Sequence, residues 1–162
     1  TPSASQILYG TYYGDTAYDE AHGVSVDGAG RAYITGQTSS EDLPVPGAVQ
    51  PEITGICLTS GTTRRFCYDA FVAAFDSAGA LSWSSYLGGT DDDQGNGLAI
   101  GPDGDIYVVG RADSSAVPMT PDALQAQSRG FDEAFLIRIG MQSAPPVGEP
   151  GSHRVFLPLV RR

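Results

Sequence analysis

The sequence predicts an all-β protein of two four-stranded antiparallel sheets, built from an internal repeat and followed by an extra C-terminal strand. The first observation is that residues 11–36 return as residues 85–110 after a shift of 74 positions, with 8 of the 26 aligned positions identical. The second is composition, because 21 glycines, 11 prolines, 8 tyrosines and 6 phenylalanines favour strands and turns over helices. One repeat cannot bury its own faces, so the two copies are expected to share a core.

Each copy is predicted to contain four strands, recognised by alternating apolar positions and by turns rich in glycine, aspartate and proline. The strands of the first copy span residues 7–14, 22–27, 31–38 and 69–76. Those of the second copy span residues 81–89, 97–101, 105–112 and 133–140. Apolar residues on both sides of the third and fourth strands indicate sheets that are covered on both faces.

The chain is accordingly divided into five parts. An N-terminal segment (1–6) precedes the first repeat (7–80) and the second repeat (81–140), and a linker rich in proline and glycine (141–152) leads to a C-terminal tail (153–162). At 162 residues the two repeats suit one domain or two small units with a common core. The opening TPSASQ, without a methionine, fits the mature end of an exported protein, and a trimmed chain would look the same.

The charge balance excludes some classes of partner. The formal net charge is −10, from 19 acidic residues against 9 basic ones, and phosphate recognition needs clustered cations, so nucleic acid is not expected as a partner. All the basic residues are arginines, so lysine chemistry such as Schiff-base formation is excluded. No apolar run approaches the roughly 20 residues of a membrane helix, and no membrane span is expected.

The two cysteines, Cys57 and Cys67, lie in a stretch of the first repeat that the second repeat lacks. A disulfide that closes an inserted hairpin is the favoured interpretation, and it agrees with an exported protein. Two buried free thiols are the alternative. Metal binding is not expected, because no histidine lies nearby.

Several short motifs resemble the bacterial β-propeller repeat family known as SBBP, or seven-bladed β-propeller repeats. They are Tyr86-Leu87-Gly88-Gly89, Gly97-Leu98-Ala99-Ile100, Gly104 to Gly110 and Asp132-Glu133-Ala134-Phe135 in the second copy, with counterparts in the first. The resemblance covers about residues 7–140. It implies four-stranded blades in secreted or surface proteins, and it implies no catalytic residues.

Two blades are fewer than the roughly four to eight that close a propeller, so sheet edges are expected to stay open. The tail offers a strand for such an edge, because it alternates apolar residues over Val155, Phe156, Leu157, Pro158, Leu159 and Val160. These residues are the predicted subunit interface. Docking onto the chain's own second sheet and donation to a neighbouring chain both stay open, with a cell-surface sorting signal as a third alternative.

Acidic residues cluster at the same place in both copies. Asp19 and Glu20 in the first copy, and Asp91, Asp92 and Asp93 in the second, are candidate Ca²⁺ ligands, since carboxylate oxygens suit that ion. Their spacing matches no known calcium loop, so capping of the turns between strands is favoured, with Asp19 and Asp93 accepting backbone N–H groups. No cofactor is expected.

No arrangement of side chains indicates catalysis. The only histidines are His22 and His153, and neither has a counterpart of its own type in the other repeat. Tyrosines and Trp83 could form a platform for a glycan, but aromatic pairing between strands is the favoured explanation. The predicted function is therefore that of a non-catalytic, secreted structural protein, a subunit of an extracellular filament or surface assembly in which the C-terminal tail adds as a β-strand to a neighbouring subunit. The alternative is a monomeric cell-surface module that binds glycans.

Overall fold

A computed structural model describes residues 5–58, 64–115, 117–130 and 132–141, which form nine strands and no helix. The strands are β1 (Asp19–Val26), β2 (Ala32–Thr38), β3 (Ile56–Leu58), β4 (Arg64–Phe66), β5 (Asp69–Phe75), β6 (Leu81–Leu87), β7 (Asp93–Ile100), β8 (Ile106–Ala112) and β9 (Glu133–Ile139). All pairs of neighbouring strands are antiparallel. The predicted all-β antiparallel fold class is confirmed.

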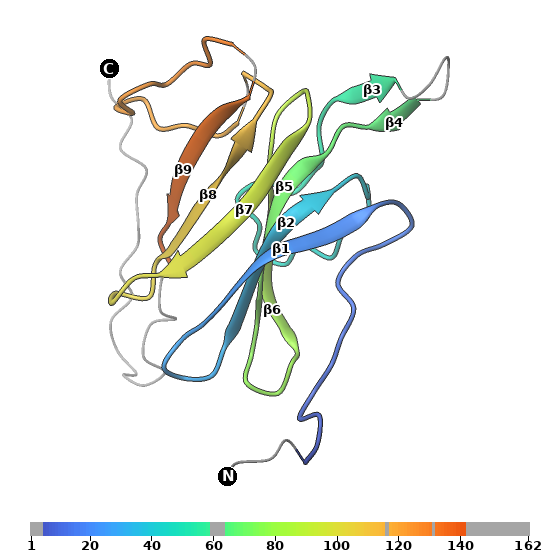
Figure 1. Ribbon diagram of the computed structural model, residues 1–162, viewed down its shortest axis with the longest axis vertical. Coiled ribbons are helices and arrows are strands. Elements are labelled where there is room, and N and C mark those ends of the chain that lie inside the picture. Colours follow the sequence, from blue (N-terminus) through green and yellow to red (C-terminus); the bar gives the residue numbers. More distant parts are fainter. Residues whose placement is uncertain (1–4, 59–63, 116, 131, 142–162) are drawn as a thin grey trace, which may run out of the picture.

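The first sheet has the strand order β1-β2-β5-β6, so its last strand comes from the second repeat (Figure 1). A tight turn explains this pairing. The Asp76 N–H donates to the Ala80 carbonyl, and Gly79 adopts a φ of 85°, so β6 folds back directly onto β5. A hairpin closed over so few residues has a low entropic cost.

This order corrects the predicted assignment of strands to sheets. Residues 7–14, expected to begin the first sheet, form no strand, and the place beside β5 is held by β6. The second sheet has the order β7-β8-β9 and therefore three strands among the described residues rather than four. The sequence repeat predicted most of the strand positions, but it did not reveal that the first strand of the second repeat, β6, pairs with the sheet of the first repeat.

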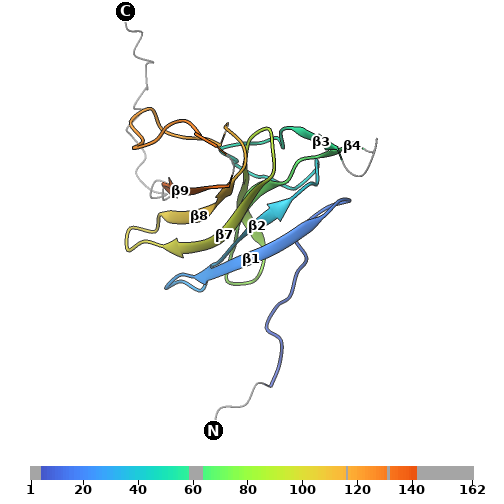
Figure 2. The same ribbon diagram turned by 45° about the horizontal axis from the view of Figure 1, so that its top comes forward.

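The two sheets pack face to face, with a buried cluster between them (Figure 2). From the first sheet it contains Ala70, Val72 and Ala74 of β5, and from the second sheet it contains Ile106, Val108, Phe135 and Ile139. A second cluster lies on the other face of the first sheet, around Phe71, Phe75 and Tyr86. Alternation along β5 thus divides its side chains between two cores, as period-two geometry requires.

Identical glycines in the two repeats coincide with β-bulges. The register shifts between Ala21 and Gly23 in β1, and between Gly95 and Gly97 in β7. Opposite each bulge stands Gly36 or Gly110, and a Cβ at either position would overlap a carbonyl oxygen, of Glu20 or of Gln94. These glycines are required by close approach of backbones rather than by an unusual φ.

No helix within the described part of the chain is long and apolar enough to cross a membrane. The predicted linker beyond Met141 and the tail with Val155, Phe156, Leu157, Pro158, Leu159 and Val160 lie outside the described residues.

Replacing Gly36 with alanine is predicted to destabilise the protein by at least about 2 kcal/mol, because the added methyl group must push β1 away from β2. The matched control is Gly28→Ala, since no atom lies within 4 Å of a Cβ built there. Urea unfolding followed by tryptophan fluorescence measures both changes. Equal stability of the two variants would contradict this account of the bulge.

Candidate functional site

In the first sheet, β6 fills a slot between β5 and the segment 43–50. On one side it pairs with β5 from Leu81 to Leu87. On the other side the N–H of Ser84 donates to the Pro46 carbonyl (3.4 Å), and that of Tyr86 to the Gln50 carbonyl (3.2 Å). Since N–H directions alternate along a strand, the N–H groups of Ser85 and Leu87 face β5. Both edges of β6 are thereby engaged.

Tyr86 occupies the centre of this slot. Its side chain is fully buried (0% exposed), and its hydroxyl donates to the Ser40 carbonyl (2.8 Å) while accepting from the Leu43 N–H (3.1 Å). Burial raises the pKa of Tyr86 to about 12. The slot therefore buries the aromatic ring and also provides hydrogen-bond partners for the hydroxyl, as a buried tyrosine requires.

Gln50 joins the end of β6 to the sheet. Its Oε1 accepts from the Gly88 N–H (3.0 Å), and its Nε2 donates to Asp69 Oδ2 (3.0 Å). A Cβ on Gly88 would overlap the Asp69 carboxyl group, so glycine is needed at this point. The end of β6 is thus fixed by one amide side chain and one glycine.

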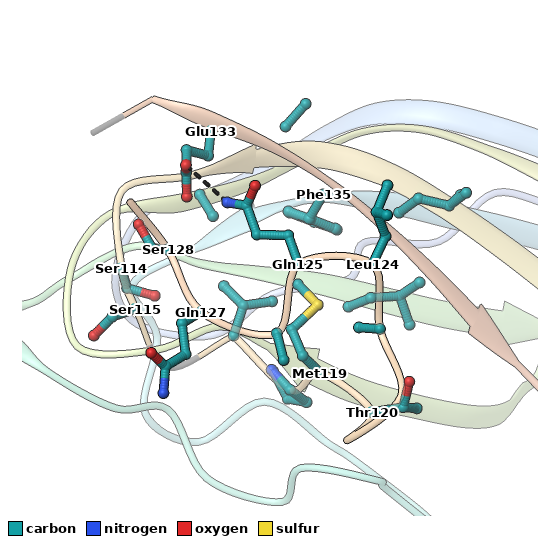
Figure 3. Close-up of a pocket in the computed structure, with 18 of the residues that line it drawn as sticks. Ser114, Ser115, Met119, Thr120, Leu124, Gln125, Gln127, Ser128, Glu133 and Phe135 are labelled. Carbon is teal, nitrogen blue, oxygen red and sulfur yellow. Dashed lines mark hydrogen bonds between the residues drawn. The ribbon is translucent and has the colours of Figure 1, made fainter. Parts of the chain in front are cut away.

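The corresponding slot of the second sheet is an open groove of about 770 Å³ between β9 and the segment 117–128. Figure 3 shows Phe135, Met119 and Leu124 on its apolar wall and Ser114 and Ser115 at one end. Gln125 Nε2 donates to Glu133 Oε1 (2.9 Å), as Gln50 does to Asp69 in the first sheet. The groove therefore has the same parts as the filled slot.

The outer edge of β9 has no strand partner among the residues that the structure describes. The outer face of the same sheet carries two exposed apolar residues, Leu136 at 64% and Val109 at 49%, between the paired arginines Arg111 and Arg138. An open edge next to exposed apolar residues and an open groove is a surface suited to adding a β-strand. We take this surface, which we call the β9 edge, as the candidate functional site.

The equivalent aspartates of the two repeats, Asp19 and Asp93, accept hydrogen bonds from the turns beside them. Asp19 accepts from the Asp15 N–H (2.9 Å) and from the Ser40 hydroxyl (2.9 Å). Asp93 accepts from the Gly89 N–H (2.7 Å) and from the Ser114 hydroxyl (2.9 Å). The two aspartates thus hold the same contacts in both repeats, as turn capping predicts.

The five candidate Ca²⁺ ligands do not gather into one cluster in the described part of the chain. Asp92 receives two hydrogen bonds from Arg65 (both 3.0 Å), Glu20 accepts from the Tyr18 hydroxyl (2.8 Å), and Asp91 accepts from Thr90 (3.3 Å). The three potential ligand atoms that do lie close together belong to Cys57, Cys67 and Asp92. The two cysteines form a disulfide, so their sulfurs are not free thiolates.

The disulfide confirms the predicted closure of an inserted hairpin, which consists of β3 and β4. The insertion reaches the crossover between the two sheets. Arg65 stacks on the Tyr68 ring (4.0 Å to the centroid) while it pairs with Asp92, just before β7 begins. The hairpin therefore ties the first sheet to the start of the second.

Three of the aromatic residues proposed as a glycan platform make contacts within the protein. Tyr86 is buried, Trp83 Nε1 donates to the Gly47 carbonyl (2.9 Å), and the Tyr13 ring packs on Phe71 (5.2 Å between centroids). Among the histidines, His22 lies between the Gly95 carbonyl and Glu20. His153 is outside the described residues.

Asp69 is a buried carboxyl that the sequence did not single out. It is 0% exposed, and its Oδ1 has no hydrogen-bond partner among the described residues. Burial raises the pKa of Asp69 to about 8, against the opposing hydrogen bond from the Thr54 N–H, and the nearby Asp93 raises it further. The pKa of Asp93 is also raised by burial. Alignment of Asp69 with Glu133 and of Gln50 with Gln125 was the signal available in the sequence.

Comparison with known families identifies the repeat in both copies. The family model described as "Beta-propeller repeat" (SBBP) matches residues 8–44 and 82–115, one match in each repeat. The search of the curated proteins finds no match to the chain. Both family matches begin at equivalent positions of the 74-residue repeat, residue 8 in the first copy and residue 82, in β6, in the second.

Replacing both Cys57 and Cys67 with serine is predicted to cost about 2–3 kcal/mol of stability, the loop-entropy value for a bridge over this short separation. Thermal unfolding with and without reductant measures the loss. Reductant should lower the melting temperature of the parent protein and leave the double variant unchanged. A parent protein that is insensitive to full reduction would contradict a stabilising role.

The raised pKa of Asp69 makes stability depend on pH. The folded state keeps a proton that the unfolded state loses above about pH 4, so stability should fall between about pH 4 and pH 8, by up to about 1.4 kcal/mol per pH unit. Asp69→Asn is neutral throughout and should reduce this slope, leaving the smaller part due to Asp93. Glu133→Gln is the control, because hydrogen bonds led by that of Ser128 lower the pKa of Glu133. An unchanged slope in Asp69→Asn would show that Asp69 is ionised in the folded state.

Proposed function

Because the chain carries two copies of the SBBP β-propeller repeat, we propose that it is a non-catalytic structural subunit of an extracellular assembly. In this assembly, strand addition at the β9 edge joins one subunit to the next. The observation that carries the proposal is the offset pairing of strands, in which the first sheet is completed by the following repeat and the second sheet has three strands among the described residues.

Two further properties support this function. The disulfide agrees with an oxidising compartment, and the repeat family agrees with a surface or secreted protein. The contact is heterologous, since an edge of one copy meets a different surface of the next, so copies add head to tail into a ring or an open filament. The tail at residues 153–160 is one source of the added strand.

A monomeric glycan-binding module is the second candidate. The observation that favours it is the groove itself, which combines an apolar wall with polar side chains such as Gln125 and Ser114. In that case the groove would take up a small ligand as a saturable site. Assembly would then be absent.

The proposed function predicts concentration-dependent assembly that a proline on the β9 edge abolishes. The N–H of Leu136 faces outward by the alternation seen in the first sheet, so Leu136→Pro should preserve the monomer and block an incoming strand. Val24→Pro is the matched control on the free edge of β1, where strand addition is not proposed. Light scattering and electron microscopy should show assemblies of the parent and of Val24→Pro, and monomers of Leu136→Pro. A parent protein that stays monomeric and binds glycans would contradict the proposal.

A further inference from the structure

We propose that residues 7–13 of one copy of this chain form the missing fourth strand of the second sheet in another copy. The inference rests on the proposed function, and it names the donor and the register of the added strand. Residues 7–13 correspond to β6 through the 74-residue shift, because Tyr12 matches Tyr86 and Gly14 matches Gly88. Since β6 completes the sheet before it, residues 7–13 are expected to complete a sheet as well.

The two equivalent tyrosines differ completely in exposure. Tyr86 is 0% exposed in the slot of the first sheet, whereas Tyr12 is 102% exposed. Ile7, in the same segment, is also exposed, at 85%, whereas its equivalent Leu81 is half-buried. An exposed apolar segment with a buried structural equivalent indicates a site that is filled by association.

The open groove matches the requirements of Tyr12. The Tyr86 hydroxyl is bound by the Ser40 carbonyl and the Leu43 N–H, and the equivalents of these residues are Ser114 and Val117, which both line the groove. Phe135, the equivalent of Phe71, forms the adjacent apolar wall. Tyr12 can therefore bury its ring and satisfy its hydroxyl in the groove of another copy, as Tyr86 does in the first sheet.

The end of the strand is also matched. In the first sheet Gln50 holds Asp69 with its Nε2 and accepts the Gly88 N–H with its Oε1. In the second sheet Gln125 already holds Glu133. Its Oε1 is in position to accept the N–H of Gly14, the equivalent of Gly88.

The position of residues 7–13 on the first sheet is suited to pairing with the second sheet of another copy. Tyr13 packs its ring against Phe71 (5.2 Å) and Phe75 (5.9 Å). Its equivalent Leu87 lies in one buried cluster with Phe135 and Ile139, the equivalents of those phenylalanines. The N-terminal segment therefore sits against the first sheet as β6 sits against the second.

The register of the added strand follows from that of β5 and β6. Because Ser85 pairs with Val72 and Leu87 with Ala70, Thr11 should lie opposite Leu136, and Tyr13 opposite Ala134. Such pairing brings the first sheet of the donor over the exposed face of the acceptor that carries Leu136 and Val109. The packing between copies would then repeat the packing between the two sheets of one copy, so the array can continue indefinitely or close into a ring.

Disulfide trapping tests the register. Equal amounts of Thr11→Cys and Leu136→Cys proteins, distinguished by a mass tag, are mixed and mildly oxidised in about 0.3 M salt, where repulsion between copies of charge −10 is screened. Directly opposed residues in a sheet are within disulfide reach, so cross-linked heterodimers should form. Gly10→Cys mixed with Leu136→Cys is the control and should cross-link at least tenfold less, since Gly10 faces the other side of the strand. Equal trapping of both pairs would overturn the register.

Tyr12→Ala tests the donor. The side chain is fully exposed in the monomer, so its loss should leave thermal unfolding of the monomer unchanged and weaken assembly at least tenfold. Leu8→Ala is the matched control, because the equivalent residue is Ser82 and no apolar pocket is expected to receive it. If Tyr12→Ala assembles normally and removal of residues 153–162 abolishes assembly, the tail is the donor and this inference is wrong while the proposed function stands. If the parent protein never assembles, the proposed function itself fails.

Discussion

The structure depends on one constraint of β-sheets: the backbone N–H and carbonyl groups of a strand point to both of its edges, and those that are buried away from water require a hydrogen-bond partner. The first sheet meets this requirement by taking its last strand, β6, from the repeat that follows. The tight turn from Asp76 to Ala80 enforces that choice, because it returns the chain antiparallel to β5 at once. The boundary of the sheet is therefore displaced from the boundary of the repeat by one strand. The open β9 edge and the unpaired segment at residues 7–13 are both consequences of this displacement.

The contacts around β6 fix the crossover from the first sheet to the second, although the segments that connect the strands are irregular. The crossover from β6 to β7 is held by the Asp93 carboxylate on the Gly89 N–H and by Arg65 on Asp92. The disulfide-closed hairpin supplies Arg65, so an insertion in one repeat stabilises the junction with the other. Buried carboxylates such as Asp69 are part of the same junction. A protein whose sheets are joined by shared strands can accept a further copy through the same kind of junction.

Much of the fold could be predicted from the sequence, and the remainder could not for a physical reason. Alternation located most of the strands, and the turn-capping role of Asp19 and Asp93 followed from their place in the repeat. The error concerned residues 7–14, because a local pattern records that a segment can be a strand and does not record which sheet pairs with it. The groove could not be predicted from the sequence, because its existence depends on how the segment 117–128 is placed beside β9 in the folded chain. Comparison of equivalent positions, such as Gln50 with Gln125, becomes informative only when the surroundings of one of them are known.

The central claim is that each sheet is completed by the first strand of another repeat. Amide hydrogen exchange of the assembled protein, compared with the dilute monomer, tests it most directly, because protection requires a paired N–H. The amides of Thr11 and Leu136 should exchange rapidly in the monomer and become protected together on assembly. The amide of Ile137, which faces β8, should be protected in both states. Assemblies in which Thr11 exchanges as fast as in the monomer would contradict the account.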